Sequence, residues 1–141
     1  MTDLTENLKK LDGYLARFRD KGILNIIDGH DAAASTGATF DTYSPTDESL
    51  ICSVARGSVD DIDRAAKAAK AAFPAWRDMP ATDRKKILHK IADAIVARAD
   101  EIALCESWDT GQPLRFMSKA AIRGAENFRY FADMATKARD G

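Results

Sequence analysis

The sequence lacks the features that mark several large classes of protein. Lysine and arginine number 21 against 22 acidic residues, so the chain has no basic excess of the kind that nucleic-acid binders carry. No apolar run approaches the ~20 residues that a membrane-spanning helix needs. The polar start, Met1 to Glu6, shows no signal peptide. These absences predict a cytoplasmic protein that has neither nucleic acid nor a membrane as partner.

Cysteine and large apolar side chains are also scarce. The two cysteines, Cys52 and Cys105, form neither a disulfide framework nor a metal cluster, and reduced structural thiols are the favoured interpretation. Leu, Ile, Val and Phe together supply 28 of the 141 residues, whereas alanine alone supplies 25. This composition favours helices that pack closely through alanine faces, against a partner inside or outside this chain.

Apolar residues recur at helical spacing over much of the chain. Helices are predicted for 3–21, from Ser58 to Phe73, from Pro80 to about Trp108, and from about Arg115 to Lys137. Pro74 and Trp76 are expected to end the second helix, and the Gly and Pro of 109–113 to end the third.

The β signals are confined to the first half of the chain. The apolar run 23–27 meets Asp28-Gly29, a hairpin or turn signal, and 30–38 is expected to be a loop. Strands are predicted for 39–43 and 50–55, with a turn at 44–47. The chain by itself is therefore predicted to be mainly α, with about four helices and a small antiparallel β unit.

The residues show no catalytic constellation. There is no Ser/His/Asp order with a nucleophile elbow, no His/Cys/Asp/Glu set at metal spacing, and no Gly-rich phosphate loop between a strand and a helix. His30 and His89 are far apart and are interpreted as structural or solvated. Neither cysteine has an evident base. We therefore predict no catalytic and no cofactor-binding residue in this chain.

Three segments, in register, resemble the start of the aldehyde dehydrogenases. The first is Ile26-Ile27-Asp28-Gly29 followed by the strand ending in Ser44-Pro45, which is similar to the family's "I-N-G" turn and "N-P" strand end. The second is the helix from Ser58 to Trp76, with its "A-F-x-x-W" end. The third is Trp108-Asp109-Thr110-Gly111-Gln112-Pro113, similar to "D-x-G-K-P" with Gln112 in place of lysine. The resemblance covers about Ile23 to Gly141.

The last helix resembles one branch of that family in particular. Ile122 to Asp133 is similar to the "I-P-R…N-F…F-A" pattern of the hydroxymuconic and carboxymethyl-hydroxymuconic semialdehyde dehydrogenases, without the proline and one residue shorter. The resemblance implies an α/β fold for the whole family member. It implies that 1–22 is an N-terminal helical extension and 23–141 an incomplete N-terminal part of the cofactor-binding domain.

The resemblance also implies an activity. The family oxidises an aldehyde or semialdehyde to its acid with NAD or NADP, through a thiohemiacetal on a cysteine, and a glutamate activates water. Those residues lie beyond the first 141 positions of the family, so this chain is expected to be inactive and to bind no cofactor by itself. The intact enzyme is expected to be a homo-oligomer. The alternative is a stand-alone interaction module that docks on a partner through its alanine-rich helices.

Four site residues follow from the resemblance. Thr42, the carbonyl of Tyr43, and Asp109 match the positions that hold a monovalent cation in many members. The alternative is that Asp109 accepts local N–H groups in its turn. Arg123, on the last helix, matches a position near the substrate entrance, where a guanidinium would hold a substrate carboxylate. The alternative for Arg123 is a solvated helix arginine.

Overall fold

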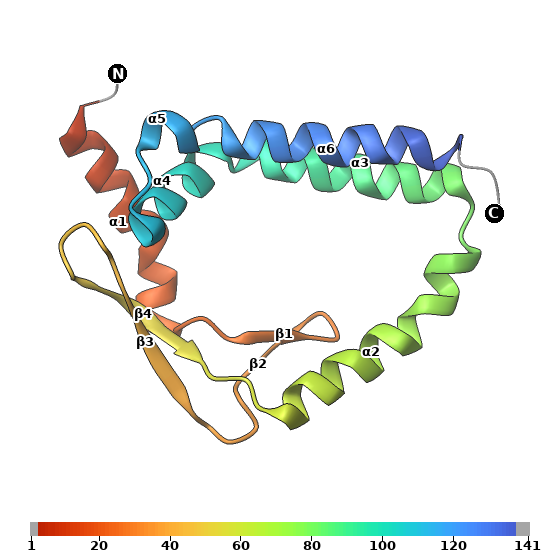
Figure 1. The fold of residues 1–141 in the computed structure, drawn as a ribbon, viewed down its shortest axis with the longest axis horizontal. Helices are drawn as coiled ribbons and strands as arrows, with labels where there is room; N and C mark the ends of the chain where they lie inside the picture. The colour runs from red at the N-terminus through yellow and green to blue at the C-terminus, as the bar shows by residue number, and fades with distance from the viewer. Residues whose placement is uncertain (1–2, 138–141) are drawn as a thin grey trace. The chain divides into compact units, whose positions relative to one another are not determined.

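The computed structural model describes residues 3–137, which form helices and short antiparallel hairpins (Figure 1). The described residues fall into two compact units. The first unit holds the residues up to Pro74 together with Trp108–Gly111, and the second holds Ala75–Ser107 and the residues from Gln112 on. The mainly helical fold with small antiparallel sheets is as predicted.

In the first unit, helix α1 (Leu4–Lys21) packs on the hairpin of β3 (Thr39–Tyr43) and β4 (Leu50–Ala55). Leu11 and Leu15 of α1 and Ile51 and Cys52 of β4 are buried. The strands are antiparallel, with a bulge between Thr42 and Tyr43. The predicted helix and both predicted strands therefore form, and they enclose the core of this unit.

Gly22 ends α1 in a backbone conformation that suits glycine alone. Its φ is +69° and its ψ −177°, and its N–H donates to the Phe18 carbonyl at 2.8 Å. A Cβ at this position would lie 2.7 Å from the Ser53 carbonyl oxygen on β4. The next residue, Ile23, exchanges backbone hydrogen bonds of 2.8 Å with Ser53 and Ala55. Gly22 thus lets the chain leave the helix and meet β4 at once.

A second hairpin follows, and it corrects one prediction. β1 (Asn25–Ile27) pairs with β2 (His30–Ala32) around Asp28 and Gly29, whose φ angles are +54° and +76°. Both central residues of the turn have positive φ, as a two-residue hairpin turn of type I′ requires. The expected loop 30–38 is therefore wrong in its first three residues, because the turn brings them back to pair with β1.

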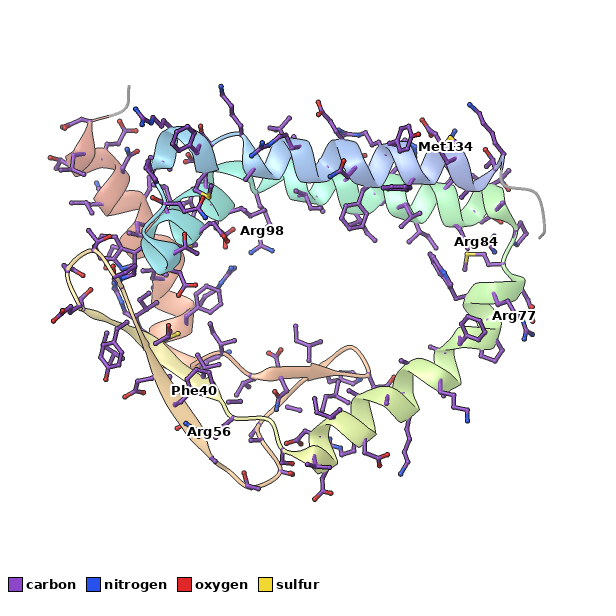
Figure 2. The ribbon with its side chains drawn as sticks, in the orientation of Figure 1. Phe40, Arg56, Arg77, Arg84, Arg98 and Met134 are labelled. Carbon is purple, nitrogen blue, oxygen red and sulfur yellow. The ribbon has the colours of Figure 1, made fainter. Side chains whose placement is uncertain are left out.

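Helix α2 (Val59–Asp78) runs through Pro74, where we predicted its end. Proline's fixed φ is compatible with a helix, although its ring removes one hydrogen bond. Many alanines, which are strong helix formers, flank Pro74 in this helix. The propensity of these neighbours outweighs the local break. The side chain of Arg84 also closes the end of α2 (Figure 2), since its Nη1 donates to the carbonyls of Arg77, at 3.0 Å, and of Met79.

The first turn of α2 is fixed by Asp61. Its carboxylate is buried and accepts the backbone N–H groups of Ser58 at 2.9 Å and Ser35 at 3.0 Å, besides both serine hydroxyls. These hydrogen bonds, those from the backbone first, lower the pKa of Asp61 to about 2. The aspartate therefore ties the loop after β2 to the start of the helix.

The two longest predicted helices are each divided in the structure. The third becomes α3 (Ala81–Ala97) and α4 (Ala99–Thr110), separated at Arg98, whose φ of −112° and ψ of 19° leave the helical region. The last becomes α5 (Leu114–Met117) and α6 (Ala120–Ala135). At the break between α3 and α4, the Arg98 guanidinium donates two hydrogen bonds of 2.8 Å to the carboxylate of Glu101, in the first turn of α4.

Helices α3 and α6 form the core of the second unit and run side by side in Figure 1. The ion pairs Lys85–Asp133 (3.0 Å) and Asp93–Arg129 (2.8 Å) show that they are antiparallel. The buried alanines of these two helices are Ala92 on α3 and Ala121, Ala125 and Ala132 on α6. Close packing through alanine, as the composition predicted, thus occurs here. On α2, by contrast, Asp61 is the buried residue among those described.

Candidate functional site

Two of the predicted cation ligands lie beside each other in the first unit. The Thr42 hydroxyl on β3 donates to Asp109 Oδ1 at 3.4 Å. Asp109 belongs to the last turn of α4 and not to the turn after it, because the helix continues to Thr110. Gly111 then ends the helix with a φ of +73°, and a Cβ there would lie 3.0 Å from the Pro45 ring. The backbone at Gly111 therefore lies close to Pro45, in the turn that follows β3.

The other members of this neighbourhood are Tyr43 and Cys52. The Tyr43 side chain is exposed, and its backbone follows the bulge in β3. Cys52 is buried and pairs with Thr42 across the hairpin. Burial, with the nearby carboxylates of Asp109 and Asp41, raises the pKa of the Cys52 thiol. This environment disfavours the thiolate, so Cys52 is a poor nucleophile. Among residues 3–137 no group of three or more His, Cys, Asp or Glu side chains is arranged to hold a metal ion.

Arg123 lies on α6, in the second unit. Its side chain is exposed, and it has no ion pair or hydrogen bond with the residues that the structure describes. Ala121 and Ala125, two positions away on either side, are buried. Since successive helix positions are about 100° apart, Arg123 projects from the face of α6 opposite to these alanines. Its charge is therefore available to a ligand.

The two borders of the α3–α6 contact differ in chemistry. On one border, Asp133 accepts from His89 Nε2 at 2.9 Å and from Lys85 at 3.0 Å, and the two partners, His89 first, lower the pKa of Asp133. His89 thus has a structural role, as expected. The other border is apolar and hollowed: Leu88, Asn127, Phe128 and Phe131 line a space of about 240 Å³.

Sequence reasoning did not predict this hollow. Phe128 and Phe131 are apolar residues at helical spacing in the sequence, yet Phe131 is 66% exposed. A signal that could have found Asn127 is its spacing of four residues from Arg123, which places both on one side of a helix. The contribution of Leu88, from another helix, had no signal in the sequence.

Comparison with known proteins identifies the family. Residues 32–141 match the sequence profile of the aldehyde dehydrogenase family. This chain belongs to the aldehyde dehydrogenase family. The match, like the resemblance of the three motifs, lies in the N-terminal part of the family domain.

Relatives of this aldehyde dehydrogenase segment include a semialdehyde dehydrogenase. It is 38% identical over 116 residues to the 2-hydroxymuconic semialdehyde dehydrogenase of Pseudomonas sp. strain CF600, an alignment that covers 81% of this chain and 24% of that protein. The crystal structure of HpcC from Thermus thermophilus superimposes with a TM-score of 0.90 at 34% identity, covering 95% of this chain and 26% of that one. The crystal structure of PnpE in complex with nicotinamide adenine dinucleotide superimposes with a TM-score of 0.81 at 41% identity, covering 84% of this chain and 25% of that one.

This chain is much shorter than the relatives that it matches. The chain spans about a quarter of the length of the relatives it matches. Among the helices within residues 3–137, none has the length and apolar character that would let it cross a membrane.

Proposed function

We propose that these residues are the N-terminal part of an NAD(P)-dependent aldehyde dehydrogenase that oxidises an aldehyde or semialdehyde to its acid. The observation that carries the proposal is the family match over 32–141, supported by the similarity to HpcC across 95% of the chain. Residues 1–22 would be a helical extension and 23–141 part of the cofactor-binding domain. The intact enzyme would be a cytoplasmic homo-oligomer.

In this reaction the chemistry belongs to the rest of the polypeptide. A cysteine thiolate that attacks the aldehyde and a glutamate that activates water would come from other positions of the family domain, and NAD(P) would supply the hydride acceptor when bound. The described residues include no Gly-rich loop between a strand and a helix that fits a pyrophosphate. We therefore assign no cofactor contact to this segment and give its residues roles in the binding of substrate and ions.

Arg123 is proposed to hold the carboxylate of the substrate. Its free guanidinium on the outer face of α6 supports this role, because a planar fork of donors matches a carboxylate. In the intact enzyme, Arg123→Ala is expected to lower kcat/KM for a carboxylated semialdehyde by roughly 10- to 150-fold, the equivalent of a charge-assisted pair. An equal change with a neutral aldehyde of similar size would contradict the role.

Thr42, the Tyr43 carbonyl and Asp109 are proposed to bind a monovalent cation in the intact enzyme. The hydroxyl-to-carboxylate distance of 3.4 Å supports the grouping, since oxygen ligands suit hard cations. We expect KCl to raise the melting temperature above that in tetramethylammonium chloride, and Asp109→Asn to remove the difference. Asp12→Asn, at an exposed position of α1, is the control.

An interaction module is the second candidate function. The large apolar side chains on α2 support it, because Val59 is 84% and Ile62 69% exposed. The genomic sequence after the Gly141 codon separates the two proposals. An in-frame continuation whose product forms NAD(P)H from an aldehyde supports the dehydrogenase. A stop codon followed by an unrelated gene, with capture of a partner that Ile62→Asp abolishes, supports the module.

A further inference from the structure

We infer that Asn127 is a specificity-determining residue for carboxylate-bearing aldehydes, and that the apolar hollow beside it receives the hydrocarbon part of such a substrate. The inference rests on the proposed function and extends the site beyond Arg123. It starts from the position of Asn127 between an unpaired cation and an apolar hollow on the same helix.

The helix geometry places the three parts in a row. Arg123, Asn127 and Phe131 follow one another at intervals of four residues on α6. Such residues are neighbours on a helix surface, with the row turning by about 40° and rising about 6 Å at each step. The row therefore begins on the outer face at Arg123 and turns toward α3. There Phe128 and Leu88 complete the hollow.

The polar groups of this row are free to bind a ligand. Neither the Arg123 guanidinium nor the Asn127 amide has a hydrogen-bond partner among the residues that the structure describes. On the opposite border, by contrast, Arg129 pairs with Asp93 and His89 with Asp133. A carboxylate accepts bonds at about four lone-pair positions. Two guanidinium N–H groups and one amide N–H from Asn127 suit that acceptor, and the amide oxygen can accept from a hydroxyl on the substrate.

The hollow suits a short hydrocarbon chain. Its volume is about 240 Å³, and Asn127 is the single polar residue among the described residues that line it. An apolar cavity of about 150 Å³ holds a benzene molecule, so a six-carbon chain fits here. An aldehyde with a carboxylate at one end would place that end at Arg123 and Asn127 and its carbon chain against Phe128 and Phe131.

The test uses an intact enzyme. This segment is joined either to its natural continuation or to the part of the Pseudomonas 2-hydroxymuconic semialdehyde dehydrogenase that follows the matching region. Asn127→Ala should lower kcat/KM for a carboxylated semialdehyde about 10-fold or more, the effect of a lost hydrogen bond to a charged group, and leave a neutral aldehyde of similar size unchanged. Asn127→Asp should be worse for the acid substrate because it repels the carboxylate. Thr136→Val, at the exposed residue that follows the C-terminal end of α6, is the control.

Two readouts separate this inference from the proposed function. If the enzyme oxidises both aldehydes and Asn127→Ala changes both equally or neither, the inference is overturned and the proposed function stands. If no aldehyde is oxidised, the proposed function fails, and calorimetric titration with adipate, a six-carbon dicarboxylate, decides the inference. Adipate binding that Asn127→Asp weakens at least 10-fold supports the site, whereas no binding, or binding that the change does not affect, overturns it.

Discussion

Replacement of Gly22 by alanine should destabilise the first unit, whereas the same replacement of Gly13, inside α1, should not. The backbone at φ +69° and ψ −177° lies in a region that residues with a side chain rarely adopt, at a cost of about 1 to 3 kcal/mol. The new Cβ would also lie 2.7 Å from a backbone oxygen of Ser53, which no side-chain rotation relieves.

The clash threatens two further interactions. Moving β4 away from position 22 strains the 2.8 Å bonds of Ile23 to Ser53 and Ala55, each worth about 0.5 to 1.5 kcal/mol. The combined loss in unfolding free energy is then about 2 to 6 kcal/mol. Gly13→Ala is the matched control, because Gly13 lies within α1 with nothing within 4 Å of its added Cβ. That change should stabilise the protein by about 0.5 to 1 kcal/mol.

Urea unfolding followed by far-ultraviolet circular dichroism measures both changes. The two variants should shift the midpoint in opposite directions, with Gly22→Ala lower and Gly13→Ala higher than the parent. If Gly22→Ala unfolds at the same urea concentration as Gly13→Ala, the conformation assigned to position 22 and its contact with β4 are wrong.

Three further predictions address other parts of the molecule. The pKa of Asp61 is lowered from 3.8 to about 2, so its contribution to stability is complete above about pH 5 and is lost as the pH falls toward 2. In urea unfolding measured against pH, Asp61→Asn should reduce the loss of stability between pH 5 and 2. An unchanged loss would contradict this. Ala92→Leu, at a fully buried position, should lower the free energy of unfolding by about 1 to 3 kcal/mol through overpacking. Ala94→Leu, at an exposed position on the same helix, should change it little. Equal midpoints in thermal melts would show that the alanine contact is loose. The pure 141-residue chain should form no NAD(P)H with aldehydes, and turnover that is lost with Cys105→Ala would refute this.

The short-range signals of the sequence predicted much of the first unit. Asp28-Gly29 indicated the hairpin turn, and Gly22 and Gly111 ended their helices with positive φ, because these local conformations depend on the residue itself. The break at Arg98 had no such signal. It contains neither glycine nor proline, and it is held by the Arg98–Glu101 pair, an interaction that spacing alone does not distinguish from an ordinary helical ion pair.

The candidate site shows the same division between local and long-range information. The neighbourhood of Thr42 and Asp109 was expected from the resemblance and not from composition or spacing, since 67 positions separate the two residues. Arg123 was likewise singled out by the resemblance, and its exposure on α6 is seen in the structure. The hollow beside Asn127 required Leu88 of α3, and the pairing of two helices that are distant in sequence is not encoded in either helix alone.

Pro74 gives the chain a natural boundary for partial unfolding. The residue lies inside α2, yet it is also the last residue of the first segment of the first compact unit. Since proline has no N–H, the carbonyl of Lys70 lacks its helical donor and the hydrogen-bond ladder is interrupted there. Proteins also open in contiguous cooperative units, and the boundary between the two compact units falls at this residue. Amide hydrogen exchange should therefore change in steps across this helix, with the residues before and after Pro74 reporting the opening of different units.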